Sequence, residues 1–326
     1  MFLPYVDLHC DTLMLAWLKK QGDAFEIESS MADVRKLAAG GCRAQLFAVF
    51  LPPGESLKKH DASLSDEAYI GVLHGIFENM VSKHGDMLAK ALNDSDIERN
   101  ANEGKLSAIL AMEDCRAVNG SFENINRFYD MGFRVMGLTW NLQNCFGVPN
   151  SPDPAIMNAG LTDFGKEAVP YMQSLGMIPD VSHLSDGGFW DVARFSTKPF
   201  IASHSNCRAI NPHPRSLTDE MIRALADRGG VMGVNFYGAF LGKDTGSTVS
   251  TVDAISAQLR HRINVGGIEC AAIGTDFDGI DGELEIPDAS AMPRLFDELA
   301  KRGFTAYELE HIAYKNAERV FREVMR

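Results

Sequence analysis

The sequence predicts an α/β protein of the (β/α)8 TIM-barrel class, and three observations carry this prediction. Short apolar runs, often β-branched, recur along the chain, and each is followed by a longer helix-like segment. There are eight such runs, and eight strands alternating with helices favour a barrel. Polar side chains end most of the runs, as expected where barrel strands converge on one mouth. An open doubly wound sheet is the competing architecture, but it would spread these side chains along an edge.

The individual elements follow from the pattern of apolar residues. Amphipathic segments such as 65–92 and 218–230 are expected to be helical. Thr218 is a suitable N-cap, Asp219 and Glu220 suit the first turn, and glycines follow where this helix should stop. The strands are expected at residues 5–11, 42–51, 106–114, 134–141, 177–184, 199–205, 230–237 and 270–279.

Composition is that of an ordinary globular protein. The chain has 326 residues, 45% of them hydrophobic and 23% charged, and we expect one barrel domain over residues 1–326. The formal net charge is −13 with Lys and Arg scattered, which argues against nucleic acid as a partner. The six cysteines form no C-x-x-C pair, so we expect reduced thiols.

We expect no targeting or membrane segment in this sequence. The opening residues, MFLPYVDLHCDT, enter a strand pattern at once and include no basic region, so no signal peptide is expected. No apolar run reaches the ~20 residues that would span a bilayer. The expected location is therefore the cytoplasm, with no membrane partner.

Several residues at predicted strand ends have side chains that can bind metals. His9 and Asp11 lie two residues apart on one strand, so their side chains share a face. Glu113 follows an apolar run, where a carboxylate is costly to bury without a partner; a salt bridge to Arg116 is the alternative. His183 and Asp276 also end apolar runs, as does His204, although lone histidines there are usually structural and Asp276 or Asp278 can simply cap a turn.

Taken together, these residues favour a metal centre. Three histidines and at least three carboxylates are expected at one mouth, where unpaired carboxylates would repel one another. Two divalent cations would relieve that repulsion, and Glu113 can bridge them. Zinc lowers the pKa of bound water towards ~7, and Asp276 suits the role of proton shuttle. The residues thus predict a dinuclear hydrolase.

At this point the chain resembles a known family, the membrane (renal) dipeptidases, which are zinc dipeptidases of the amidohydrolase-like barrels. The resemblance runs nearly end to end, and its motifs are jointly specific in their order and spacing. They are DLHCDT, AMEDC, DVSHLS, ASHSNCRAINPHPRSLTDEMI, GGVMGVNFY, IGTDFDG and NAERVFREV.

The resemblance implies a role for each matching residue in a two-zinc site. His9, Asp11 and Glu113 would hold one Zn²⁺, and Glu113, His183 and His204 the other, with Glu113 bridging. It also implies a homodimer and a dipeptide substrate.

The resemblance also implies the residues that contact the substrate. Asp276 would act as the general base beside the hydroxide, and Arg215 would pair with the terminal carboxylate of the dipeptide. Tyr237 is expected either to line the pocket or to pack in the core. Trp140 stands where the renal enzyme has a histidine that contacts the substrate, with Asn141 beside it. Indole is a donor only, so this departure points to a change of specificity.

The sequence therefore predicts a dinuclear zinc dipeptidase that cleaves the peptide bond with metal-bound hydroxide. A first alternative keeps the barrel and the metals but takes a lactone, a cyclic amide or a deaminase substrate, because fold does not fix chemistry. A second alternative is a non-catalytic metal-binding barrel.

Overall fold

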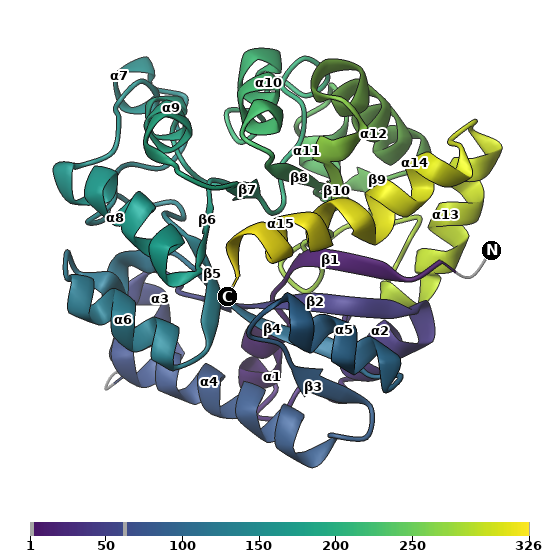
Figure 1. Ribbon diagram of the computed structural model, residues 1–326, viewed down its shortest axis with the longest axis horizontal. Coiled ribbons are helices and arrows are strands. Elements are labelled where there is room, and N and C mark those ends of the chain that lie inside the picture. Colours follow the sequence, from purple (N-terminus) through teal and green to yellow (C-terminus); the bar gives the residue numbers. More distant parts are fainter. Residues whose placement is uncertain (1–2, 61–63, 326) are drawn as a thin grey trace.

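The computed structural model describes residues 3–60 and 64–325, and its centre is a closed barrel of eight parallel strands (Figure 1). Each strand pairs in parallel with the next around the barrel, and the last pairs with the first. This confirms the predicted (β/α)8 fold and the approximate position of all eight strands. In order around the barrel they are β1 (Tyr5–Cys10), β2 (Cys42–Phe50), β4 (Leu106–Glu113), β5 (Phe133–Gly137), β6 (Ile178–Asp180), β7 (Ile201–Ala202), β8 (Val231–Val234) and β10 (Ala271–Ile273).

Helices surround the barrel and follow most of its strands (Figure 1). A π-helical turn at His311–Lys315 joins the last two helices. The helices are α1 (Thr12–Leu18), α2 (Val34–Gly40), α3 (Gly54–His60), α4 (Asp66–Lys83), α5 (Asp94–Asn102), α6 (Phe122–Asp130), α7 (Pro154–Met157), α8 (Asp163–Leu175), α9 (Asp186–Phe195), α10 (Asp219–Asp227), α11 (Gly238–Leu241), α12 (Val252–Gly266), α13 (Met292–Lys301), α14 (Ala306–Glu310) and α15 (Asn316–Val324).

Helix α10 begins and ends as the sequence predicts. The Thr218 hydroxyl accepts a hydrogen bond from the Met221 amide, which satisfies one of the free N–H groups of the first turn. Gly229 follows the helix with φ +70°, a left-handed conformation that glycine adopts without a steric penalty.

The structure corrects the prediction of one continuous helix over residues 65–92. Helix α4 ends at Lys83, and β3 (Leu88–Lys90) then adds an outer strand beside β4. Two further short strands, β9 (Val249–Ser250) and β11 (Glu283–Leu284), form a separate parallel pair. Several barrel strands are also shorter than predicted, so that many polar residues lie just beyond the strand ends.

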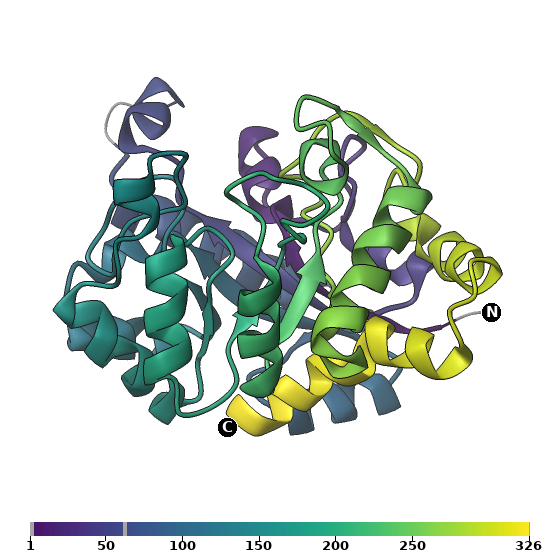
Figure 2. The same ribbon diagram turned by 90° about the horizontal axis from the view of Figure 1, so that it is seen from above.

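The amino-terminal end of the barrel is closed by helix α15. Apolar side chains from the barrel interior, such as Val6 and Val231, form one cluster with Val320, Phe321 and Val324 of this helix. Figure 1 shows α15 crossing the barrel, and Figure 2 shows it, in yellow, along the lower edge. We call this end the floor and the carboxyl end of the strands the mouth.

The barrel closes where the first strand meets the last. Asp7 of β1 is in register with Ile273 of β10, and the Asp11 amide donates to the Phe277 carbonyl at 2.9 Å. The Thr275 hydroxyl and amide both donate to the buried Asp7 carboxylate, at 2.7 and 2.9 Å. These hydrogen bonds join the first and last strands of the barrel directly below the mouth.

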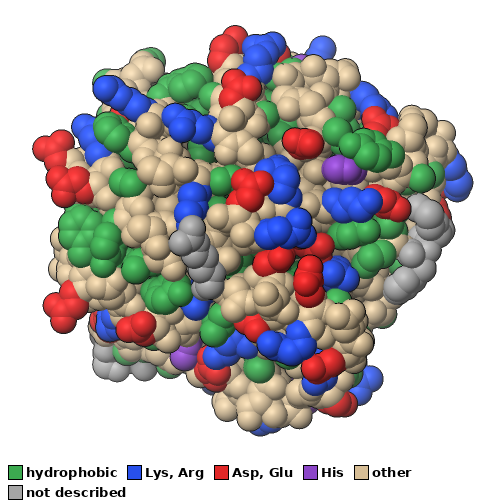
Figure 3. Space-filling model, in the orientation of Figure 1, with side chains coloured by type: hydrophobic (Ala, Val, Ile, Leu, Met, Phe, Trp, Pro, Cys, Tyr) green, Lys and Arg blue, Asp and Glu red, His purple; other side chains and the backbone are tan. Residues whose placement is uncertain are grey.

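The surface and the cysteines agree with the expectations from composition. All six cysteines are free thiols. Acidic and basic side chains are interspersed on the face shown in Figure 3. Over the described ranges, every helix is too short or too polar to cross a membrane.

Candidate metal centre and active site

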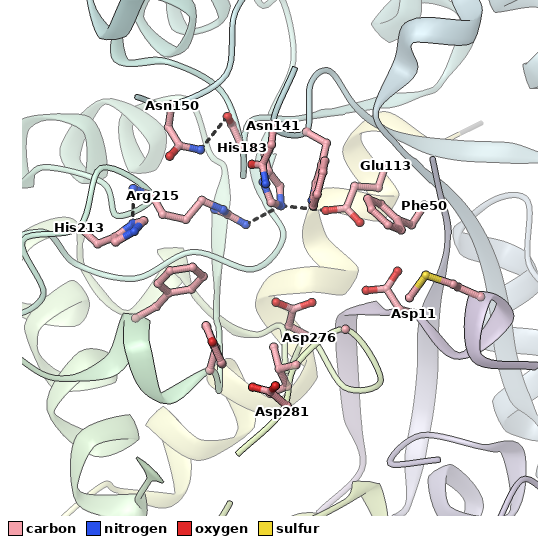
Figure 4. Close-up of a pocket in the computed structure, with 16 residues that line it drawn as sticks. Asp11, Phe50, Glu113, Asn141, Asn150, His183, His213, Arg215, Asp276 and Asp281 are labelled. Carbon is pink, nitrogen blue, oxygen red and sulfur yellow. Dashed lines mark hydrogen bonds and ion pairs between the residues drawn. The ribbon is translucent and has the colours of Figure 1, made fainter. Parts of the chain in front are cut away.

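Six of the predicted site residues gather at the mouth, each at or just beyond the end of a barrel strand (Figure 4). They share a cavity of about 470 Å³ or lie directly below it. They are His9 on β1, Asp11 just after it, Glu113 on β4, His183 after β6, His204 after β7 and Asp276 after β10.

Asp11 occupies the N-cap position of α1 and yet caps nothing. Its side chain makes no hydrogen bond to the helix, although aspartate at this position normally accepts one. The carboxylate instead lies 3.6 Å from His9 Nε2, with one oxygen buried and without a hydrogen-bond partner among the described residues. The Asp11 carboxylate is therefore not used as a helix cap and can take part in binding at the mouth.

Glu113 lies at the centre of the cluster. One of its oxygens is 2.8 Å from His183 Nε2 and 3.5 Å from His204 Nε2, and the other is 3.5 Å from His9 Nε2. The alternative salt bridge to Arg116 does not form, because Arg116 binds Asp114 and Asp66. Glu113 thus has one oxygen facing each side of the site.

His204 is oriented by a buried relay from a neighbouring strand. Its Nδ1 lies 2.7 Å from the Ser203 hydroxyl, which donates to Asp180 at 2.5 Å. Asp180 also accepts from the hydroxyl and amide of Ser182. The relay fixes the ring of His204 with Nε2 facing Glu113, the arrangement that metal-binding histidines usually have.

Asp276 is held in an unusual backbone conformation by its neighbours. Its φ is +64°, which is uncommon for a residue with a Cβ atom. Asn235 Nδ2 donates to Asp276 Oδ2 at 2.8 Å, while Oδ1 lies 3.8 Å from His9 Nε2. A Cβ atom at Gly279 would collide with the carboxylates of Asp11 and Asp276, so the turn requires glycine there. Asp276 therefore presents one oxygen to the mouth and keeps the other anchored.

Burial and crowded charges shift the pKa values of these groups. Burial raises the pKa of Asp276 to about 7 and that of Asp11 to about 6. Burial lowers the pKa of His183 to about 4. Burial opposes protonation of His9, but Glu113 and Asp11 together hold its pKa well above the usual value. Three carboxylates thus lie within 4 Å of His9 Nε2, an arrangement that suits a bound cation.

The donor set fits a metal ion. Imidazole nitrogens and carboxylate oxygens are the groups that zinc binds in proteins. His9 Nε2 is buried without a hydrogen-bond partner in the described part of the chain, as is Asp11 Oδ1. Two groups have ligand atoms within 4.8 Å of one another: His9 with Glu113 and His204, and His9 with Asp11 and Asp276. Both groups include His9, so the described residues around it offer a largely buried set of donors for a metal ion.

Arg215 is a buried cation whose partners are mostly uncharged. Its side chain donates to the Ser205 hydroxyl at 3.1 Å and lies 2.9 Å from His183 Nε2, while its Nε has no partner in the described ranges. No carboxylate of the described residues lies within 4 Å of the guanidinium, and burial lowers its pKa to about 10. An anionic group entering the cavity would complete this site.

Comparisons with known proteins give the family. The model of a family described as membrane dipeptidase (peptidase family M19) matches residues 2–326. A Klebsiella pneumoniae protein, described as an uncharacterized protein in the pqqA 5' region, is 35% identical over 256 residues, which cover 76% of this chain and 93% of that one. The chain belongs to the membrane dipeptidase family. It is a metallo-dipeptidase, a hydrolase that acts on peptide bonds.

Solved structures share the fold of this dipeptidase. A dipeptidase described as a family M19 metallo peptidase gives a TM-score of 0.90 at 23% identity, over 100% of this chain and 99% of that one. A metallo peptidase from Rhodobacter sphaeroides, liganded with a phosphinate mimic of the dipeptide L-Ala-D-Ala, gives 0.87 at 23% identity over 99% of both chains.

The cavity of the dipeptidase also includes the residues predicted to contact substrate. Arg215, Trp140, Asn141 and Tyr237 all line it, so Tyr237 lies at the pocket and not in the core. Asp278, the alternative to Asp276, points elsewhere: it accepts hydrogen bonds from the hydroxyls of Thr12 and Ser30 and from the Met31 amide.

Sequence reasoning missed several residues that line the cavity. His213, which received no role, faces the cavity, and its Nδ1 accepts a hydrogen bond from the Arg215 amide at 3.1 Å. Phe50 ends a correctly predicted strand and lies in register with Glu113 of the neighbouring strand. Its place at the end of that strand was the one signal that could have identified it as a residue of the cavity. The others come from loops and helix starts: Met14, Asn150, Phe240, Gly279, Ile280 and Asp281.

Proposed function

We propose that this chain is a dinuclear zinc dipeptidase whose catalytic domain spans residues 1–326. The observation that carries the proposal is the single mouth at which five metal-binding side chains and one buried arginine line one cavity or lie directly below it. We further propose that it works in the cytoplasm as a homodimer.

Five residues would hold the metal ions. His9, Asp11 and Glu113 hold one Zn²⁺, and Glu113, His183 and His204 hold the other. The two oxygens of Glu113 face different histidines, which suits a bridging carboxylate. When bound, the ions supply a Lewis acid for the scissile carbonyl and a source of hydroxide at neutral pH.

The remaining residues bind the dipeptide and move a proton. Arg215 pairs with the terminal carboxylate, so longer peptides, which place no carboxylate there, should be poor substrates. Asp276 takes a proton from the attacking water through its free Oδ1 and returns it to the departing amine. Its pKa of about 7 suits both halves of this transfer. The free ammonium of the substrate rests near Asp11 and Glu113, by complementarity of charge.

The similar Rhodobacter sphaeroides structure supports a dipeptide substrate, because that protein holds a mimic of L-Ala-D-Ala in the same fold. The Trp140 departure bears on side-chain preference and leaves the metal-binding residues intact.

Metal content and turnover test the proposal together. Purified protein loaded with zinc should contain two ions per chain and hydrolyse dipeptides, assayed with both stereoisomers at the second position, but not lactones or cyclic amides. Turnover of those alternative substrates alone would identify a different hydrolase. Two ions without any turnover would indicate a non-catalytic metal-binding barrel.

Arg215→Met tests the carboxylate site. The substitution should raise KM for dipeptides by roughly ten- to a hundredfold, because hydrogen bonds to charged groups contribute ~1.5–3 kcal/mol, while kcat and the zinc content stay the same. Arg208→Met is a matched control in the same loop, since Arg208 pairs with Asp186 outside the cavity. Unchanged kinetics in Arg215→Met would remove Arg215 from the proposal.

A further inference from the structure

We infer that the mouth selects dipeptides by their N-terminal side chain, which packs on an aromatic wall formed by Phe50 and Trp140, and that large apolar side chains are preferred there. The inference rests on the proposed function, because it takes Arg215 as the site of the terminal carboxylate. It adds a substrate class and two specificity-determining residues.

The wall stands beside the bridging carboxylate. Phe50 ends β2 in register with Glu113 on the neighbouring strand β4, so the two side chains point the same way. Trp140 follows β5, the strand on the other side of β4. The rings of Phe50 and Trp140 meet edge to face, with centroids 4.8 Å apart. The aromatic surface therefore extends from β2 to β5 along one side of the proposed metal centre.

The carboxylate site lies on the opposite side of the mouth. Strand β8 is four places from β4 around the eight-stranded barrel, so the segments after these strands face each other. After β8 come Tyr237 and Phe240, and the Arg215 guanidinium lies 5.9 Å from the Phe240 ring centre. Figure 4 shows Arg215 and Phe50 at opposite ends of the cavity, with His183 and Glu113 between them.

This arrangement fixes which part of a dipeptide meets the wall. With the terminal carboxylate on Arg215 and the peptide bond over the metal centre, the N-terminal residue extends towards Phe50 and Trp140. A cavity of about 470 Å³ is large enough to admit a dipeptide.

The residues at the Phe50–Trp140 end of the cavity favour one class of N-terminal side chain in the substrate. Among the described residues, no lysine or arginine lines this end of the cavity, which is formed by β1, α1, β2, β4 and the segment after β5. Their carboxylates, Asp11 and Glu113, are the proposed metal ligands, and what remains beside Asn141 is Met14 and the two aromatic rings. An apolar side chain gains contact with this surface, whereas an acidic one meets no lysine or arginine side chain there to pair with.

A dipeptide series tests the inference. We would measure kcat/KM for X-Ala with X as Gly, Leu, Phe or Asp, using the better stereoisomer of alanine, and for the reversed Ala-Leu. Leu-Ala and Phe-Ala should exceed Gly-Ala by roughly tenfold or more, since hydrophobic pockets discriminate one methylene by ~10–200-fold, and Asp-Ala should be the poorest. Equal values for Gly, Leu and Phe would overturn the inference.

Variants assign the preference to the wall. Trp140→Ala should reduce the Leu-Ala to Gly-Ala ratio by about tenfold, with the zinc content unchanged. Phe50→Ala tests the other half of the wall. Trp140→Phe keeps an aromatic ring and should keep most of the ratio, which separates loss of the wall from damage to the fold.

Trp190→Ala is the matched control, because Trp190 is 44% exposed on α9 and does not line the cavity. A uniform loss for all substrates in both wall variants would overturn the inference while leaving the proposed function standing. Failure of the wild-type protein to hydrolyse any dipeptide would instead overturn the proposed function, and this inference with it.

Discussion

The two ends of the barrel are built from different kinds of side chain. At the mouth, buried histidines and carboxylates lie within 4 Å of one another, and His9, Asp11, His183 and Arg215 each keep a polar atom without a hydrogen-bond partner in the described residues. At the floor, apolar side chains of the strands and of α15 form one cluster.

Two buried polar side chains of α15 at the floor, by contrast, have partners. Asn316 Nδ2 donates to the carbonyls of Ile268 and Ala271, and Glu318 pairs with Arg43. Unpaired buried polar groups cost free energy, so a fold keeps them only where something else depends on them. The floor should therefore carry stability, and the mouth should carry binding and catalysis.

The largest expected effect is at the mouth, from Glu113→Gln. Removing the proposed bridge should lower kcat/KM by on the order of a thousandfold or more, because metal ions contribute several kcal/mol to charge stabilisation in the transition state. Bound zinc, measured by elemental analysis, should fall below two ions per chain while the fold persists.

Glu318→Gln is the control at the floor, since this buried carboxylate pairs with Arg43 and not with the site. It should leave zinc content and kcat/KM as they are. Two ions and near-normal turnover in Glu113→Gln would remove the glutamate from the centre of the site.

The largest effect at the floor should come from Phe321→Ala. Phe321 is completely buried between α15 and the barrel, and such truncations cost ~3–5 kcal/mol of unfolding free energy. Urea denaturation measures this loss, and each folded chain should still bind two zinc ions. A variant that stays fully stable but loses zinc would contradict the division between floor and mouth.

An intermediate effect is expected from Ser203→Ala, which cuts the relay from Asp180 to His204. Zinc affinity should weaken by about ten- to a hundredfold, as is typical when the partner of a metal-binding histidine is removed. Competition with a chelator measures the affinity. Ser196→Ala is the matched control, because that buried hydroxyl has no partner among the described residues, and its zinc affinity should equal that of the wild type.

The smallest effect should come from Asn235→Ala, which frees Oδ2 of Asp276. We expect kcat to fall about tenfold with KM and zinc content unchanged, since hydrogen bonds to charged groups contribute ~1.5–3 kcal/mol. Asn211→Ala is the control: Asn211 is equally buried, but it donates to the carbonyls of Ala239 and Gly242, away from Asp276. Equal losses in both variants would mean that Asn235 supports only the fold.

The floor-to-mouth direction of the strands was readable from sequence, because apolar runs mark the barrel interior and the first polar residue after a run marks its carboxyl end. This logic located His9 and Glu113 on their strands and His204 and Asp276 just beyond theirs. The same pattern did not predict β3. This strand has only three residues and lies shortly after His84–Asp86, and so short a run cannot be distinguished from the frayed end of the preceding helix.

The rest of the site depends on contacts that no local pattern encodes. His213 and Phe240 face the cavity because long loops return there, and Asn235 meets Asp276 across 41 positions of sequence. Asp11 was expected at the mouth from its two-residue spacing to His9, and the absence of a cap bond to α1 agrees with that position. The periodicity of apolar residues predicts helices and strands, but the paths of the loops are set by tertiary packing.

The junction of β1 with β10 has a consequence for how the protein matures. Thr275 bonds to Asp7 over 268 positions, so His9, Asp11 and Asp276 cannot meet until nearly the whole chain has left the ribosome. A chain that ends before Thr275 lacks this junction and cannot assemble the proposed site. An ion held across it would tie the first strand to the last and oppose unfolding in proportion to its affinity. Metal loading would then act as a final check that synthesis and folding are complete.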